Sequence, residues 1–144
     1  MKFKLPLSVL VVVHTVDLEV LLLERAQRPG FWQSVTGSLD FAEEPLAAVA
    51  AREVREETGI DAAGGRLAPW NVANTFEIYP QWRPRFGPRV THNTEHVFGL
   101  SLARRLAVNI APAEHAAYAW LPWREAAQKC FSWSNRDAIH LLGG

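Results

Sequence analysis

The stretch Arg52-Glu53-Val54-Arg55-Glu56-Glu57-Thr58-Gly59-Ile60 decides the fold predicted for this chain. It completes the clearest helix in the sequence, which runs from Pro45 to Thr58 through an alanine-rich interior. Pro45 suits a first helical position, and Gly59 suits the residue that ends a helix. The glutamates of the stretch therefore lie in the last turns of the helix.

These glutamates share a face with the hydrophobic residues of the helix. With about 100° between successive residues, Glu53 and Glu57 continue the apolar stripe that Leu46 begins. Glu56 flanks this stripe. The first turns are therefore expected to bury hydrophobic side chains, and the last turns direct carboxylates to the same side.

Clustered carboxylates at the end of a helix need an explanation. Like charges four residues apart destabilise a helix, and the helix dipole disfavours anions near the C-terminus. Two explanations fit the helix taken alone. The carboxylates bind a hard divalent cation such as Mg²⁺ or Mn²⁺, or they form a solvated face that pairs with Arg52 and Arg55.

The same stretch resembles the second half of the Nudix box, R-E-U-x-E-E-x-G-U, in which U is an apolar residue. The first half of that box is G-x5-E-x7. Counting back from Arg52 gives Glu44, whereas counting forward from Gly37 gives Glu43. Because a loop accommodates an insertion that would rotate a helix face, we assign Glu44 to the box and expect an extra residue in the preceding loop.

Resemblance to the Nudix family implies an α+β fold, an α/β/α sandwich with a mixed sheet and a loop-helix-loop motif. One such domain is expected over residues 1–144. The carboxylates of the box bind divalent metal in this family, which implies that Glu53, Glu56 and Glu57 are metal ligands and catalytic residues. The other matches are structural, with the arginine bracing the first glutamate: Gly37, Glu44, Arg52 and Gly59.

Segments outside the box resemble one branch of the family, the bacterial pyrophosphohydrolases of dihydroneopterin triphosphate. The matching segments are Phe31 to Ser38, Asn93 to Glu95, Glu114 with His115, Tyr118 and Trp120, and Ser132 to Arg136 with Ala138 and Ile139. The positions implied to contact substrate are Lys4, Arg25, Thr36, Phe76, Glu77, Ile78, Tyr79 and Ser132. Glu114 matches a metal ligand outside the box, although its residue type alone favours a cap after Pro112.

The predicted reaction is Mg²⁺-dependent hydrolysis of dihydroneopterin triphosphate to the monophosphate and pyrophosphate. Metal ions neutralise phosphate oxygens and lower the pKa of water, and a carboxylate takes the proton of the water that attacks the α-phosphorus. Glu56 and Glu57 are the candidate bases. Further candidates for phosphate contacts are Arg83, Arg85 and Arg89.

Three other functions fit the same box. A nucleoside-triphosphate pyrophosphatase, acting for example on dATP, would carry identical metal ligands, and so would a dinucleoside polyphosphate hydrolase. A ligand sensor with the Nudix fold but no catalysis fits less well, because a sensor need not keep Glu53, Glu56 and Glu57. The relative turnover of dihydroneopterin triphosphate and dATP separates the first alternative from the predicted function.

Composition limits the partners of the chain. The 144 residues are 49% hydrophobic and carry 15 basic and 15 acidic side chains, so no net charge favours nucleic acid or an anionic membrane. No apolar run reaches the ~20 residues of a membrane helix. One cysteine, Cys130, indicates a reducing cytoplasm. The expected partner is a small pterin or nucleoside triphosphate, with no obligate protein partner.

The tryptophans and three of the histidines are not expected to take part in catalysis. Most of the six tryptophans are expected in the core, with one or two available to stack on a pterin. His92, His96 and His115 lack zinc-ligand spacing and are interpreted as surface residues or as neighbours of the site.

The other predicted elements follow from hydrophobic patterning and turn residues. Strands are expected at Leu7 to Val13, Val16 to Glu24, Phe31 to Thr36 (ended by Gly37), Trp70 to Ile78, Glu95 to Ala103 and Tyr118 to Leu121. Helices are expected at Trp123 to Cys130 and Ser134 to Leu142, and an irregular loop at Pro80 to Pro88.

Overall fold

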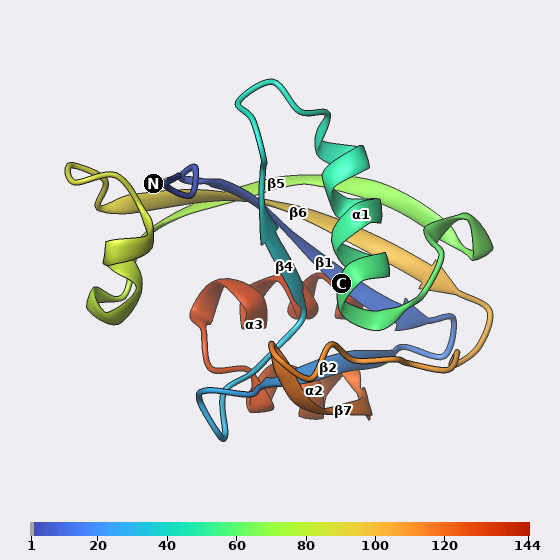
Figure 1. Cartoon of the computed structure of the whole chain (residues 1–144). Helices are drawn as coiled ribbons and strands as arrows, with labels where there is room; N and C mark the ends of the chain where they lie inside the picture. Colours follow the sequence, from blue (N-terminus) through green and yellow to red (C-terminus); the bar gives the residue numbers. More distant parts are fainter. Residues whose placement is uncertain (1) are drawn as a thin grey trace.

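A mixed seven-stranded sheet forms the middle layer of the protein (Figure 1). The computed structural model describes residues 2–144. The strands are β1 (Leu7–Thr15), β2 (Glu19–Arg25), β3 (Trp32–Gln33), β4 (Val35–Ser38), β5 (Arg66–Glu77), β6 (His92–Leu102) and β7 (His115–Pro122). Their order is β3-β2-β1-β6-β5, with β4 pairing with β1 and β7 with β2. Among the strands named here for residues 2–144, only β1 and β6 pair in parallel, so the predicted mixed sheet is confirmed.

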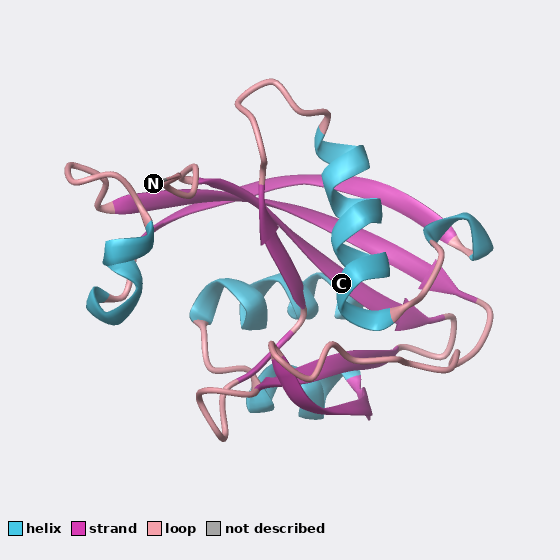
Figure 2. Ribbon diagram, in the orientation of Figure 1, coloured by secondary structure: helices cyan, strands magenta, loops and turns pink. Residues whose placement is uncertain are grey.

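Helices cover both faces of this sheet (Figure 2). Helix α1 (Leu46–Thr58) lies on one face, and α2 (Trp123–Lys129) and α3 (Trp133–His140) lie on the other. Three 3-10 helices connect the larger elements: η1 (Ala62–Gly64), η2 (Pro80–Arg85) and η3 (Leu141–Gly143). Within residues 2–144, no helix is long and apolar enough to cross a membrane. The arrangement is the predicted α+β, α/β/α sandwich.

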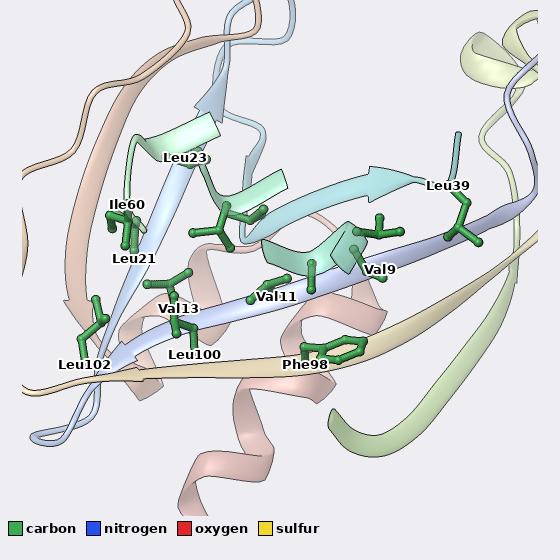
Figure 3. Close-up of a cluster of buried hydrophobic side chains, with 14 residues drawn as sticks. Val9, Val11, Val13, Leu21, Leu23, Leu39, Ile60, Phe98, Leu100 and Leu102 are labelled. Carbon is green, nitrogen blue, oxygen red and sulfur yellow. The ribbon is translucent and has the colours of Figure 1, made fainter. Parts of the chain in front are cut away.

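Alternation along β1 builds two separate cores. Val9, Val11 and Val13 point toward α1 and form one buried cluster with strands β2 and β6 (Figure 3). Leu10 and Val12 point the other way and pack with residues of α2 and α3. Because successive strand residues face opposite sides, a strand covered on both faces is apolar throughout. The first core holds α1 against one face of the sheet, and the second holds α2 and α3 against the other.

The ends of α1 are set by Pro45 and Gly59. Pro45 has an extended ψ of 127° and precedes the helix, while its carbonyl accepts from Ala48 and Val49. The prediction that Pro45 occupies the first helical position is therefore wrong by one residue, since an N-cap residue has this geometry. Gly59 ends the helix with a φ of +75°, as predicted, and its N–H donates to the Arg55 carbonyl.

The strands lie where they were predicted but differ in their bounds, and two of the differences have a clear local cause. The strand expected from Val16 begins at Glu19, because the chain turns at Leu18, which has a φ of +63°. The strand expected from Trp70 begins at Arg66 and includes Pro69, which a sheet tolerates at an edge, where β5 lies.

Two local predictions near the site are wrong. Gly37 does not end a strand: a bend after Gln33 separates β3 from β4, and Gly37 pairs with Val9 inside β4. The segment Pro80 to Pro88 is not irregular throughout, since η2 occupies its first part. Both features form walls of the cavities described next.

Candidate active site

The last turns of α1 face a cleft of about 740 Å³. We call it the carboxylate cleft. Its acidic lining comes from α1, from the loop before α1 and from the loop before β7. Its basic lining comes from the N-terminal segment, β2, η2 and α1. The charged residues that line it are Lys2, Lys4, Arg25, Asp40, Arg52, Glu53, Glu56, Glu57, Arg85 and Glu114. The structure therefore brings together the four acidic residues predicted to hold metal.

Burial of the α1 carboxylates follows the predicted helical stripe. The exposed fraction of the side chain is 4% for Glu57, 13% for Glu53 and 56% for Glu56. Val49, Ala50 and Val54 anchor the same helix in the core, so the burial of Glu57 is a consequence of where the apolar residues lie. The deepest carboxylate is thus held at the floor of the cleft by a rigid helix.

Arg52 bridges Glu44, the first glutamate of the motif, and Glu53, the second. Its Nη2 donates to both carboxylate oxygens of Glu44, at 3.3 and 3.2 Å, and its Nη1 donates to Glu53 Oε2 at 2.9 Å. Glu44 Oε1 also accepts from the backbone N–H of Asp40 at 2.7 Å. The expected contact between Arg52 and Glu44 is present, and the loop at Asp40 accommodates the longer spacing from Gly37.

Gly37 makes room for Glu53. A Cβ at Gly37 would overlap the Cγ, Cδ and Oε1 atoms of the Glu53 side chain. The glycine of β4 therefore lets the carboxylate of α1 lie directly against the strand. This close approach explains a glycine in the middle of a strand, where it otherwise weakens pairing.

Burial and mutual repulsion disfavour two negative charges at the cleft floor. Burial raises the pKa of the Glu57 carboxyl well above its ordinary value, and the nearby Glu53 and Glu114 raise it further. Burial also raises the pKa of Glu53, with Glu56 adding to the effect and Arg52 opposing it. Carboxylates placed so that they repel one another are stabilised by a bound cation.

The donor set fits a hard divalent cation. Four carboxylates supply only oxygen ligands, as Mg²⁺ and Mn²⁺ prefer, and Glu57 Oε1 is buried without a hydrogen-bond partner. As the side chains lie within residues 2–144, no group of three acidic, histidine or cysteine residues is arranged so that it could hold a metal ion. Arg52 Nη1 lies 2.9 Å from Glu53 and 3.7 Å from Glu56, so a cation competes with Arg52 for these oxygens.

His115 lies beside Glu57 at the back of the cleft. Its Nε2 is 3.9 Å from Glu57 Oε1, and its side chain is 4% exposed. Burial lowers the pKa of this imidazole, which favours its neutral form. Of the three histidines predicted at the surface or near the site, His92 is exposed, His96 is half-buried and His115 is the one next to a carboxylate.

Three basic side chains border the cleft on the side away from α1. We call Lys4, Arg25 and Arg85 the cationic border. The Lys4 backbone N–H donates to the Arg85 carbonyl at 2.8 Å, and Arg25 donates to Gln33 at 3.3 Å. Burial and the charges of Arg85 and Arg25 lower the pKa of Lys4. Cations held close enough to repel one another are suited to bind a polyanion such as a triphosphate.

A second cavity of about 220 Å³ opens on the other side of the cationic border, which lines both cavities. We call it the ring pocket. Its aromatic wall contains Tyr79, Trp82 and Phe131, whose ring centroids are 5.3 to 6.0 Å apart. Arg25 lies over Trp82, 4.6 Å from the ring centroid. The other lining residues come from β5, β6 and the start of α3, and include Asn93, Glu95, Ser132 and Ser134.

The predicted substrate positions divide between the two cavities. Lys4, Arg25 and Thr36 line both. The end of β5, the two residues that follow it and the N-cap of α3 line only the ring pocket: Phe76, Glu77, Ile78, Tyr79 and Ser132. Arg83 and Arg89 are absent from both linings. Arg83 instead pairs with Glu77 at 2.8 Å. Of the additional arginines predicted to bind phosphate, only Arg85 lines the cavities.

The tryptophans follow the same division. Trp32, Trp70, Trp120 and Trp123 pack against the two cores as half-buried side chains, while Trp82 and Trp133 line the ring pocket. The polar floor of this pocket was not predicted from the sequence. Asn93, Glu95 and Val97 lie two residues apart on β6 and therefore share one face of the strand. Two polar residues on the same face as a buried valine were the sequence signal that could have indicated this floor.

Known proteins resemble this chain over nearly its whole length. The sequence pattern of the NUDIX domain matches residues 4–142. The chain is 45% identical over 141 residues to dihydroneopterin triphosphate diphosphatase of Escherichia coli, covering 95% of this chain and 91% of that protein. It is 35% identical over 142 residues to the Haemophilus influenzae protein of the same name, covering 96% and 88%.

A solved structure extends the likeness to three dimensions. The structure of E. coli dihydroneopterin triphosphate pyrophosphohydrolase superposes with a TM-score of 0.90 and 42% identity, covering 98% of this chain and 97% of that one. The domain match, the identities and the superposition each extend over nearly the whole chain. The chain belongs to the Nudix hydrolase family.

Proposed function

We propose that this protein hydrolyses dihydroneopterin triphosphate to dihydroneopterin monophosphate and pyrophosphate, with Mg²⁺ as its metal. One observation carries the proposal: the cationic border lies between a cleft of carboxylates and a pocket with aromatic walls, and it lines both. A molecule with a ring at one end and a triphosphate at the other matches this order. Relatives named dihydroneopterin triphosphate diphosphatase, 45% and 35% identical, support the same substrate.

Each part of the substrate has residues to hold it. The ring enters the ring pocket, and Lys4, Arg25 and Arg85 contact the phosphates through charge-assisted hydrogen bonds. Glu53, Glu56, Glu57 and Glu114, which line the carboxylate cleft, would hold the metal. Enzymes of this family generally use divalent metal ions, and a resident cation neutralises phosphate oxygens and lowers the pKa of water.

Catalysis requires a group that accepts a proton from the attacking water. Glu56 and Glu57 are the candidate bases, because both line the cleft and neither is the main partner of Arg52. His115 Nε2 lies 3.9 Å from Glu57 Oε1, beside this candidate base. Attack at the α-phosphorus releases pyrophosphate and leaves the monophosphate attached to the pterin.

The test compares substrates and products directly. We expect kcat/KM in Mg²⁺ to be higher for dihydroneopterin triphosphate than for dATP, with pyrophosphate as the released product, and we expect excess chelator to abolish turnover. A clear preference for dATP would instead assign the chain to nucleotide-pool pyrophosphatases. Release of orthophosphate would refute attack at the α-phosphorus, and undiminished turnover in chelator would refute the metal mechanism.

A further inference from the structure

The floor of the ring pocket holds a carboxylate that the proposed reaction does not use. Glu95 lies on β6 and is only 5% exposed, and its Oε1 is buried without a hydrogen-bond partner. Burial raises the pKa of its carboxyl to about 7, and a hydrogen bond from Ser134 opposes this rise. A buried carboxylate with an unpaired oxygen destabilises the fold, so its presence at a cavity indicates a ligand that pairs with it.

Asn93 supplies a second unpaired acceptor on the same face of β6. Its Nδ2 donates to Ser8 Oγ at 2.7 Å, which fixes the amide so that Oδ1 is the atom left without a partner. Asn93 and Glu95 are two positions apart on one strand, and side chains two positions apart point to the same side. Both line the ring pocket. The pocket floor therefore presents two hydrogen-bond acceptors, which would be satisfied by a ligand whose edge carries N–H donors.

We propose that Glu95 and Asn93 determine specificity by accepting hydrogen bonds from the 2-amino-4-oxopyrimidine edge of the pterin ring. The Glu95 carboxylate accepts from the ring N3–H and the 2-amino group, and Asn93 Oδ1 accepts from a further N–H of the ring system. Tyr79, Trp82 and Phe131 supply apolar contact to the ring faces. This inference rests on the proposed function, because it requires the ring to occupy the ring pocket.

The donors and acceptors of the purine rings explain why Glu95 and Asn93 would select the 2-amino-4-oxopyrimidine edge. Adenine places an acceptor nitrogen next to its amino group, and that nitrogen would face the Glu95 carboxylate with no proton between them. Guanine carries the same N–H and amino pair as a pterin. A site whose buried polar groups are left unpaired by the wrong ligand discriminates strongly against it. Among deoxynucleotides, dGTP should therefore be a better substrate than dATP.

The experiment measures kcat and KM for dihydroneopterin triphosphate, dGTP and dATP with the wild type, Glu95→Gln and Glu95→Asp. Hydrogen bonds to a charged group contribute more to binding than hydrogen bonds between neutral groups. Glu95→Gln should therefore lower kcat/KM for the pterin and dGTP by ~10- to 100-fold, mainly by raising KM. Turnover of dATP should stay within ~3-fold, since this contact is not made by adenine. Glu125→Gln, on the exposed side of α2, is the control and should leave all three rates unchanged.

The outcomes separate this inference from the proposed function. If the wild type prefers dATP over the pterin, the proposed function fails first. If the wild type prefers the pterin and Glu95→Gln keeps that preference, the inference fails while the function stands. An equal loss on all three substrates would assign Glu95 a structural role and also overturn the inference. Should Glu95→Gln not fold, Glu95→Asp must show the selective loss on the pterin, and full activity of that variant would contradict the proposal.

Discussion

The carboxylate cleft and the ring pocket use buried acidic residues in opposite ways. In the cleft, four carboxylates gather beside Arg52 and repel one another, which suits a cation. In the ring pocket, Glu95 is a buried acid among aromatic and amide side chains, and the other acidic lining residue, Glu77, is exposed; this setting suits neutral N–H donors. Burial raises the pKa of the deepest acid in both places. The neighbours, and not the burial, therefore distinguish a metal site from a recognition site.

The largest expected effect concerns the deepest acid of the cleft. Glu57→Gln keeps the side-chain volume and removes an anionic oxygen at the cleft floor, where the side chain is 4% exposed. Loss of a positioned metal ligand or base should lower kcat by ~100-fold or more. The measurement is pyrophosphate release at saturating Mg²⁺, with circular dichroism to check folding.

Glu125→Gln again serves as the control, because it removes an exposed carboxylate of α2 and should not change kcat. Near-normal turnover of a folded Glu57→Gln variant would show that this carboxylate only fills space. The cleft would then resemble the ring pocket in having a buried acid that is not part of the reaction.

The two cavities also differ in how far the sequence predicts them. The acids of α1 belong to one contiguous stretch, and a helical period places Glu53 and Glu57 on the buried stripe. The ring pocket is assembled from β5, η2, β6 and the start of α3, which are far apart in the chain. No local sequence pattern predicts that Phe131 lies beside Trp82, because that contact depends on how the sheet and the helices pack together.

Errors in the predicted elements have the same physical origin. Gly37 was expected to end a strand because glycine weakens pairing, but its role depends on the approach of Glu53 from another element. The start of the second strand was predicted at Val16, too early, because a non-glycine residue such as Leu18 rarely has a φ of +63°. The presence of the buried strands and of α1 was predicted correctly, although not all of their bounds, since continuous apolar runs and a helical period are local signals.

A second test concerns the stability of the ring pocket. The folded-state pKa of Glu95 is about 7, above its ordinary value of 4.5, so the folded state holds a proton that the unfolded chain has released. Stability from this residue is thus fully present below about pH 4.5 and is lost as the pH rises through about 7. Glu95→Gln cannot ionise and should be more stable than the wild type above pH 7, by about 3 kcal/mol.

Urea unfolding at pH 5 and pH 8 measures this difference. The advantage of Glu95→Gln over the wild type should be small at pH 5 and near its full size at pH 8. Titration of Glu53 and Glu57 occurs in both proteins and cancels in the comparison. An advantage that does not change between the two pH values would show that Glu95 is not buried as a charge, and the contrast between the two cavities would weaken.

The smallest expected effect tests the position of the first motif glutamate, at the edge of the cleft. Glu44 has a side chain that is 11% exposed and contacts Arg52 Nη2 at 3.2 Å, whereas its neighbour Glu43 is exposed. Arg52 in turn contacts Glu53, so Glu44 acts on the metal site through Arg52 as a positioning residue. Loss of such a supporting contact typically costs at least ~10-fold in metal affinity or activity.

Glu44→Gln and Glu43→Gln form a matched pair, because they make the same chemical change at adjacent positions. Glu44→Gln should raise the Mg²⁺ concentration needed for half-maximal activity by ~10-fold, with a smaller change in kcat at saturating metal. Glu43→Gln should behave as the wild type. A purely structural defect in Glu44→Gln would lower thermal stability without moving the Mg²⁺ requirement. If Glu43→Gln were the impaired variant, the motif would align by its spacing from Gly37 instead, and the loop at Asp40 would not contain the extra residue. The result that supports the present assignment is a shifted metal requirement confined to Glu44→Gln, because only Glu44 is connected through Arg52 to a carboxylate of the cleft.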